Sequence, residues 1–185
     1  MTFVVNGSSV RVQTMSHIAD GAGWRSTIIL ENTDTVLALY TVSFWSDAGA
    51  SYVPQLASGT TSGSIPVGGS TIIETADIAS ALTEGWAQVT SSQSIGGAAI
   101  FRYDPWSQEA AVPLLTSGSG TLRIPYQVGN GLALGIALAN PSAAQTANIT
   151  EIIRDQNGNQ LASSTADESD QRVICACWCK CPEVC

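Results

Sequence analysis

Lysine and histidine are almost absent from this sequence of 185 residues. Lys180 is the only lysine, His17 is the only histidine, and charged residues make up 12% of the chain. Because the formal net charge is −8, the protein lacks the basic surface that nucleic-acid binding requires. Its hydrophobic fraction of 44% excludes an acidic disordered chain, since such chains have too little apolar surface to fold.

Long apolar runs are missing, and cysteine is confined to one end. No run approaches the length of about 18 apolar residues that a transmembrane helix needs, so no membrane span is predicted. Residues 1–174 contain no cysteine, which excludes a small domain held together by disulfides. Residues 1–15 show no basic region followed by an apolar stretch, so no signal peptide is visible in this chain.

Most of the sequence alternates between apolar and polar residues, the pattern of strands with one buried face. Turn signals such as Asn6-Gly7 and Asn157-Gly158 separate these segments, and the first of them predicts an N-terminal hairpin. A helix of two turns at most is suggested for 74–82. We therefore predict an all-β protein, an antiparallel β-sandwich of immunoglobulin-like or jelly-roll-like type. The predicted strands are 26–31, 36–45, 70–75, 85–90, 96–103, 132–139 and 147–154.

The chain contains an internal repeat with an offset of 108 residues (140 minus 32). Both copies show a strand, a turn containing asparagine, a longer strand and a turn of the Asp-x-x-Gly type. We assign the copies to 16–103 and 124–165 within a β-sandwich module of residues 1–168, which makes two pseudo-repeated halves. The shorter second copy lacks its last strands and leaves a sheet edge to be paired. At this offset the matched positions are Ile28/Ile136, Leu30/Leu138, Asn32/Asn140, Thr41/Ile149, Phe44/Ile152 and Asp47/Asp155, with Gly49/Gly158 after one inserted residue.

Four stretches of the chain carry a family resemblance: HIADGAGWRSTIILENTDT, EGWAQVTSSQSIGGAAIFRY, AAVPLL and GIALANPSAAQTANITEIIRDQNGNQLASS. Together they resemble an uncharacterised β-rich repeat module of large secreted bacterial proteins, over residues 16–165. The resemblance implies an exported module without catalytic activity, and it supplies no site residues. Members of that family continue into further strands after the second Asp-Gly turn, whereas this chain departs from the pattern at about Ser169.

The segment 169–185 forms a cysteine-rich tail that matches nothing in the first copy. In an extended segment, alternate residues point to one side, so four of its sulfurs would share one face. Thiolates in that arrangement suit soft metals such as Zn or Cu, whereas an odd number of cysteines favours a disulfide between chains. A third interpretation is a frameshift that gives the tail no function. The cysteines are Cys175, Cys177, Cys179, Cys181 and Cys185.

Catalytic constellations are weak, and we expect the protein not to be an enzyme. Ser16, His17 and Asp20 supply the residue types of a triad, but neighbours on one strand rarely converge as a triad requires. The acidic pairs that a glycosidase would need all lie beside turns or on alternate strand positions. The segment 155–160 offers oxygen ligands for calcium, but with a single carboxylate it is better interpreted as a hairpin turn.

The aromatic residues raise a second functional possibility. Aromatic rings stack on the apolar faces of sugars, and Tyr103 and Trp106 are the candidates for an exposed sugar-binding surface. Trp106 follows a proline in a predicted loop, whereas Trp45 and Trp86 lie in strongly alternating strands and are expected in the core.

We therefore expect a structural or adhesive β module that is secreted or at the cell surface of a bacterium. It would assemble by strand exchange or edge pairing, with copies of itself or with neighbouring β modules. Two alternatives remain: a carbohydrate-binding module that holds polysaccharide through exposed aromatic residues, and a soft-metal protein acting through its cysteines.

Overall fold

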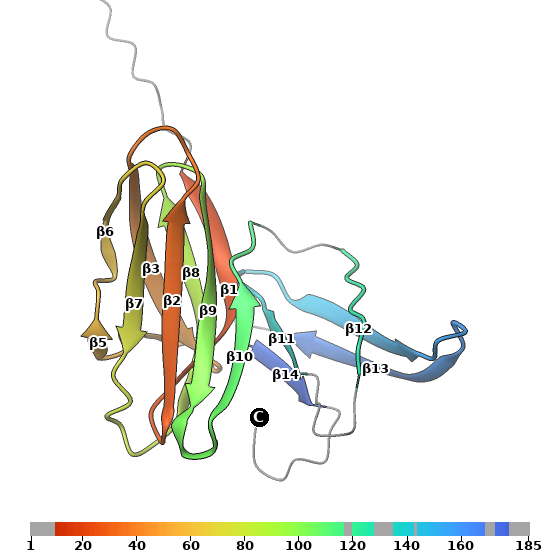
Figure 1. The fold of residues 1–185 in the computed structure, drawn as a ribbon. Coiled ribbons are helices and arrows are strands. Elements are labelled where there is room, and N and C mark those ends of the chain that lie inside the picture. Colours follow the sequence, from red (N-terminus) through yellow and green to blue (C-terminus); the bar gives the residue numbers. More distant parts are fainter. Residues whose placement is uncertain (1–9, 117–119, 128–134, 143, 169–172, 178–185) are drawn as a thin grey trace, which may run out of the picture.

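The computed structural model confirms an all-β protein built from antiparallel sheets. It describes residues 10–116, 120–127, 135–142, 144–168 and 173–177. The predicted turn at Asn6-Gly7 therefore lies outside the described residues, whereas the second strand of that hairpin runs into β1 (Arg11–Asp20). Two regions follow one another along the chain: a β-sandwich as far as Leu115, which we call the first unit, and two separate strand pairs, which we call the second unit (Figure 1).

The first unit stacks two five-stranded sheets. The first sheet has the order β1-β8-β3-β4, with β6 also paired to β3, and the second has the order β10-β9-β2-β7-β5. A single 3₁₀ turn, Asp104–Trp106, joins β9 to β10. The strands of the first sheet are β1 (Arg11–Asp20), β3 (Ala38–Ser46), β4 (Ser51–Tyr52), β6 (Ser62–Ile65) and β8 (Thr83–Ser91). Those of the second are β2 (Trp24–Asn32), β5 (Leu56–Ser58), β7 (Ser70–Thr75), β9 (Ile95–Tyr103) and β10 (Gln108–Pro113).

Alternation along the strands builds the core between these sheets. On β3 every second residue is buried, and on β2 the same holds for Ser26, Ile28, Leu30 and Asn32. Between them lies a continuous cluster of buried apolar side chains contributed by both sheets. The segment 74–82 forms no helix: β7 ends at Thr75, and irregular backbone leads to β8.

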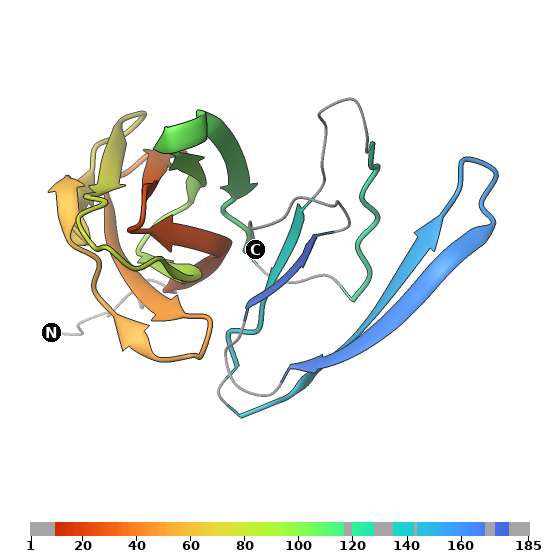
Figure 2. The ribbon, with the colours of Figure 1, turned by 90° about the horizontal axis from the view of Figure 1, so that it is seen from below.

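The second unit consists of two strand pairs that do not close into a sandwich. These are β11 (Gly135–Ala139) with β14 (Val173–Cys177), and β12 (Ala147–Arg154) with β13 (Gln160–Glu168). The first pair lies beside the sandwich, whereas the β12–β13 hairpin extends away from it (Figure 2). Beyond Leu114, none of the side chains whose burial is described (residues 115–116, 120–127, 135–142 and 144–165) is buried.

The two units repeat the same local hydrogen bonds around an asparagine. In the first unit, the Asn32 amide donates to the carbonyl of Val36 (2.8 Å) and its oxygen accepts from the backbone N–H of Asp34 (2.9 Å). In the second, Asn140 donates to the carbonyl of Gln145 (2.8 Å) and accepts from the N–H of Ser142 (3.1 Å). The second loop thus contains one residue more than the first.

That extra residue corrects the predicted alignment of the repeat. The insertion lies before β12, so β3 and β12 match at an offset of 109 (147 minus 38), and Tyr40, not Thr41, corresponds to Ile149. Ile153 replaces Ile152 as the counterpart of Phe44. Register supports this offset, because Trp45 faces Ser51 in the first unit and Arg154 faces Gln160 in the second.

Strand pairing extends the repeat into the predicted tail. Leu30 on β2 faces Thr71 on β7, and its counterpart Leu138 on β11 faces Ile174 on β14. β9 also pairs antiparallel with β2, but β14 follows β13 along the chain as β7 follows β6. By chain order, the segment Val173–Cys177, for which no counterpart was predicted, takes the place of β7. Likewise β13 takes the places of both β4 and β6. In the first unit these two strands pair with different parts of β3, and the segment between them contains β5, whereas β13 pairs with β12 along its whole length.

The counterparts of β8 and β9 are missing from the second unit as described. In the first unit β8 lies between β1 and β3, and β9 pairs with β2. At the offset of 108, β1 corresponds to the stretch that includes residues 120–127. That stretch forms no strand, and its alternating apolar residues Leu122, Ile124 and Tyr126 are 57%, 45% and 44% exposed.

Candidate functional sites

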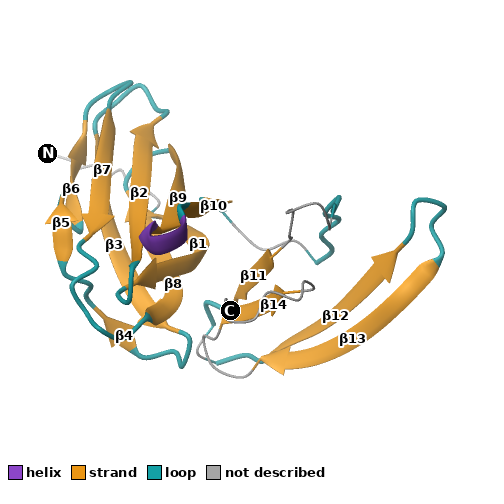
Figure 3. Ribbon diagram, turned by 60° about the horizontal axis from the view of Figure 1, so that its bottom comes forward, coloured by secondary structure: helices purple, strands orange, loops and turns teal. Residues whose placement is uncertain are grey.

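An aromatic cluster lies where β2 begins and β9 ends. Trp24 stacks on Tyr103 with ring centroids 5.0 Å apart, and Trp106 meets Tyr103 edge-on at 5.4 Å. Register explains the first contact, because Trp24 and Tyr103 are direct cross-strand partners. Trp106 is part of the 3₁₀ turn that follows β9, and this turn is drawn in purple in Figure 3.

Ion pairs and a close backbone approach hold this aromatic cluster in place. The Asp104 carboxylate forms ion pairs with Arg25 (2.9 Å) and Arg102 (2.8 Å), and all three side chains are partly exposed. Gly23, with a φ of +93°, brings the backbone against Pro105 and Tyr103, where a Cβ would approach both rings to 3.0 Å. The position therefore favours glycine both for its φ and for the lack of space.

The structure thus brings together the two residues predicted to bind sugar. Trp106 is 58% exposed, whereas Tyr103 is half-buried because Trp24 covers one of its faces. A sugar ring would find one open indole rather than a broad platform. Of the two tryptophans expected in the core, Trp86 is buried, whereas Trp45 is half-buried and stacks on Trp86 with ring centroids 4.4 Å apart.

His17 is a buried residue of the first unit. Its ring packs edge-on against Phe101 at 4.5 Å, and burial lowers its pKa from 6.5 to about 4. Asp20, the third residue of the triad considered above, accepts a hydrogen bond from the backbone N–H of Asp77 (3.1 Å). At neutral pH, His17 is therefore a neutral side chain packed against an aromatic ring.

The Asp155 turn is a self-contained hairpin turn, as the sequence predicted. The carboxylate of Asp155 accepts hydrogen bonds from the backbone N–H groups of Asn157 and Asn159, both at 2.8 Å. It also accepts one from the Asn159 side-chain amide (2.9 Å). These bonds lower the pKa of Asp155, the side-chain bond from Asn159 most of all. They occupy the carboxylate that a calcium ion would require.

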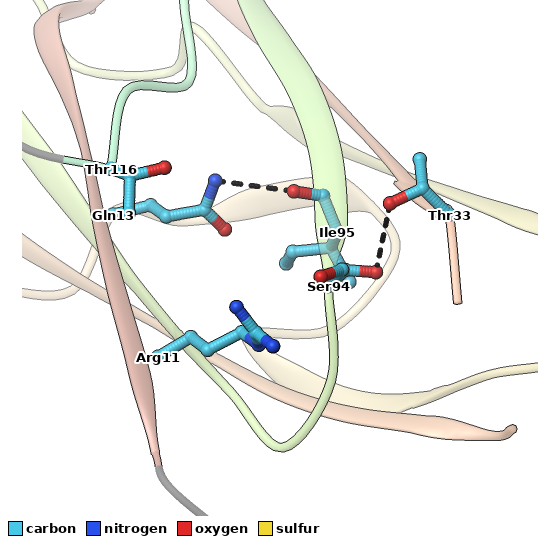
Figure 4. A pocket seen from close by; sticks show the side chains of 6 residues that line it. All are labelled: Arg11, Gln13, Thr33, Ser94, Ile95 and Thr116. Carbon is cyan, nitrogen blue, oxygen red and sulfur yellow. Dashed lines mark hydrogen bonds between the residues drawn. The ribbon is translucent and has the colours of Figure 1, made fainter. Parts of the chain in front are cut away.

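A small pocket of about 190 Å³ opens beside β1 (Figure 4). Arg11 and Gln13 point into it from β1, and Thr33, Ser94, Ile95 and Thr116 complete its lining. The buried Gln13 amide donates to the carbonyl of Ile95 (3.1 Å), while its oxygen has no hydrogen-bond partner among the described residues. The pocket can hold a few waters or a small polar group, and sequence patterns alone did not reveal it.

Of the predicted metal ligands, Cys175 and Cys177 belong to β14, where their backbones face Ala137 and Gly135 of β11. Cys179, Cys181 and Cys185 lie outside the described residues. Within the residues that are described, no group of three or more potential metal ligands occurs. Soft-metal binding therefore stays a prediction.

The unpaired edge of β12 is the most distinctive surface of the second unit. Asp155 donates its N–H to the carbonyl of Asn159 on the β13 side. Because N–H groups alternate along a strand, those of Thr150 and Ile152 point to the opposite side. No described strand pairs with β12 there. At the equivalent edge of β3 the first unit places β8.

One contact marks this edge of β12. The hydroxyl of Tyr126 donates to the backbone carbonyl of Arg154 (3.2 Å), a group that points away from β13 by the same alternation. The stretch 120–127, the counterpart of β1, is thus on the side of β12 where the first unit holds β8. The shortened second copy of the repeat predicts an exposed edge but does not indicate which strand carries it.

No family model, curated protein or solved structure matches this chain. Among the described residues, none of the helical segments has the length and apolar character of a membrane span.

Proposed function

We propose that this protein is a non-catalytic, exported structural or adhesive module that assembles through the unpaired strand edge of its second unit. One observation carries the proposal: β12 repeats β3 in register, yet the described chain has no counterpart of β8 beside it. Open edges of this kind pair readily with other chains. Export is supported by the low charge content and by the resemblance to modules of secreted bacterial proteins.

Sedimentation over a wide range of concentrations tests this proposal. The mass should rise with concentration, and Thr150→Pro should prevent the rise because proline removes an N–H from the unpaired edge and blocks strand addition. Glu109→Pro is the matched control. Leu114 donates its N–H to the carbonyl of Gly97, towards β9. Because N–H groups alternate along a strand, the N–H of Glu109 points away from β9. The control should associate like the wild type; a monomer at every concentration contradicts self-assembly.

A carbohydrate-binding function is the second candidate, and the exposed Trp106 ring favours it. Retention on immobilised polysaccharides should fall when Trp106→Ala removes the ring. Leu122→Ala, which also removes an exposed apolar side chain, is the control and should retain the wild-type behaviour. Absence of retention in the wild type, or equal retention in Trp106→Ala, would remove this candidate.

A further inference from the structure

The pocket beside β1 lies at an end of the first unit where the chain crosses from one sheet to the other. Residues 92–94 make this crossing, since β8 belongs to the first sheet and β9 to the second. Arg11 and Gln13 are alternate residues of β1, so they point to the same side, about 7 Å apart along the strand. Figure 4 shows both side chains reaching into the pocket, with the Gln13 oxygen on the side of the Arg11 guanidinium.

The orientation of the Gln13 amide is fixed by one hydrogen bond. Its nitrogen donates to the carbonyl of Ile95, and a rotated amide would place two carbonyl oxygens against each other there. The oxygen therefore stays on the pocket side, where no described residue donates to it. Gln13 is 7% exposed, and a buried acceptor without a donor reduces the stability of the fold. A ligand hydroxyl that donates to this oxygen would remove that cost.

Arg11 supplies a positive charge at the same pocket. Its side chain is exposed, and among the described residues it forms no ion pair. The pKa of Asp34 is lowered first by the hydrogen bond from the Thr35 N–H (2.7 Å), next by that from the Ser94 N–H (3.3 Å), and less by the charge of Arg11. Because backbone groups already hold that carboxylate, the Arg11 guanidinium can bind a ligand carboxylate through two parallel hydrogen bonds.

These two groups select a ligand by its chemistry. A carboxylate alone satisfies Arg11 but has no proton for Gln13, whereas a neutral alcohol leaves the charge of Arg11 without a partner. A primary ammonium brings three N–H donors, but Gln13 offers a single oxygen. The volume of about 190 Å³ equals that of about six waters in the liquid, which is room for a small organic acid.

We propose that this pocket binds a small 2-hydroxycarboxylate, whose carboxylate pairs with Arg11 and whose hydroxyl donates to the Gln13 oxygen. Ser94 and Thr116 on the pocket wall carry hydroxyls that offer further hydrogen bonds to the carboxylate. The site belongs to the first unit, so it gives the protein a binding activity that does not depend on the strand edge of β12.

Titration of the intact protein with glycolate, acetate and glycine tests the inference. Acetate lacks the hydroxyl of glycolate, and glycine carries an ammonium group in its place. Backbone amide NMR shifts detect weak binding, and they locate it when they change at Gln13, Ser94 and Ile95. The extra hydrogen bond to a buried acceptor should make glycolate bind about five-fold more tightly than acetate or glycine.

Variants show whether Arg11 and Gln13 hold the ligand. Arg11→Gln removes the charge and should weaken glycolate and acetate alike, by about ten-fold. Gln13→Met removes the acceptor at a similar side-chain length, so it should reduce the affinity for glycolate to that for acetate. Arg154→Gln is the control, because it makes the same change of net charge at an exposed position on the β12–β13 hairpin, and it should bind like the wild type.

The wild-type comparison of glycolate with acetate decides the question even if Gln13→Met does not fold. Tighter binding of glycolate, with shifts at the pocket and a loss in Arg11→Gln, supports the inference. Equal affinity for glycolate and acetate, tighter binding of glycine, or an absence of shifts at the pocket overturns it. An Arg11→Gln variant that binds glycolate like the wild type overturns it as well.

Discussion

The two units of this molecule share their local structure and differ in their cores. Each has an asparagine that closes the same kind of loop, a long strand after it, and a strand pair in the β2–β7 register. Yet the first unit buries a continuous apolar cluster, and in the second no described side chain is buried. Turns and strand register therefore persist without a closed core, while burial depends on the strands that complete each sheet.

The core face of the second unit has changed along with this loss. On β12, Ile149 and Ile153 stand in the places of the buried aromatic residues Tyr40 and Phe44. Glu151 stands in the place of Val42. A glutamate tolerates a half-exposed sheet face, but inside a closed sandwich it would be costly without a partner. The substitutions fit a surface that stays partly open to solvent.

The largest predicted difference between the units concerns two equivalent leucines. Leu30 is fully buried, so Leu30→Ala should cost about 2–5 kcal/mol in the free energy of unfolding. Leu138 is half-buried, and Leu138→Ala should cost less than about 1 kcal/mol, because most of its cavity is open to water. Chemical denaturation of both variants measures the difference. Equal losses would mean that the second unit closes a core of its own in solution.

The second prediction concerns the loss of stability at acidic pH. The only histidine of the chain, His17, belongs to the first unit. The folded pKa of His17 is about 4 against 6.5 when unfolded, so the unfolded chain binds the proton more readily. The contribution of neutral His17 is intact above pH 6.5 and is lost as the pH falls towards 4, about 3 kcal/mol in all.

Denaturation of the wild type and of His17→Gln between pH 7 and pH 4 isolates this effect. Burial raises the pKa of Asp47 and Glu84, which favours the folded state as the pH falls and partly masks the loss. Because both proteins contain these carboxyls, the difference between their pH profiles reports His17. Parallel profiles would show that His17 takes up its proton equally in the folded and unfolded states.

The smallest predicted difference compares the two loop asparagines. Asn32 is buried and also donates to the carbonyl of Ile65 (3.0 Å), so Asn32→Ala leaves buried polar groups without partners. We expect a loss of about 1–3 kcal/mol for Asn32→Ala and less than about 1 kcal/mol for the half-buried Asn140→Ala. Thermal unfolding of the two variants measures both losses of stability. A larger loss for Asn140→Ala would mean that the second unit, and not the first, has the closed core.

Alternation and turn residues sufficed to predict much of the fold. Ser70–Thr75 and Ala147–Arg154 form strands with the predicted bounds, and β2, β3, β8 and β9 differ from prediction by a few residues at their ends. The asparagine turns were predicted with their strands because Thr33 and Asp34 follow Asn32, and Pro141 and Ser142 follow Asn140, residue types that are common in turns.

What escaped prediction has a physical reason in each case. The predicted hairpin strand after Asn6-Gly7 covers only the start of β1, because a register shift between Met15 and Ile18 interrupts the alternation further along. β13 is made largely of small and polar residues that carry no period. The inserted residue before β12 leaves both loop asparagines in place, so only the hydrogen bonds reveal it. The unpaired edge depends on pairing between distant segments, which a local pattern does not contain.

The Asp155 turn has a consequence for the order of folding events. Its hydrogen bonds join residues at most four positions apart, and the strands on either side pair with each other directly. A hairpin with such local contacts forms within microseconds, ahead of the long-range pairing of the sandwich. β12 is therefore ordered by its pairing with β13 before another strand binds to its edge. The entropic cost of ordering β12 then does not reduce the affinity for that strand.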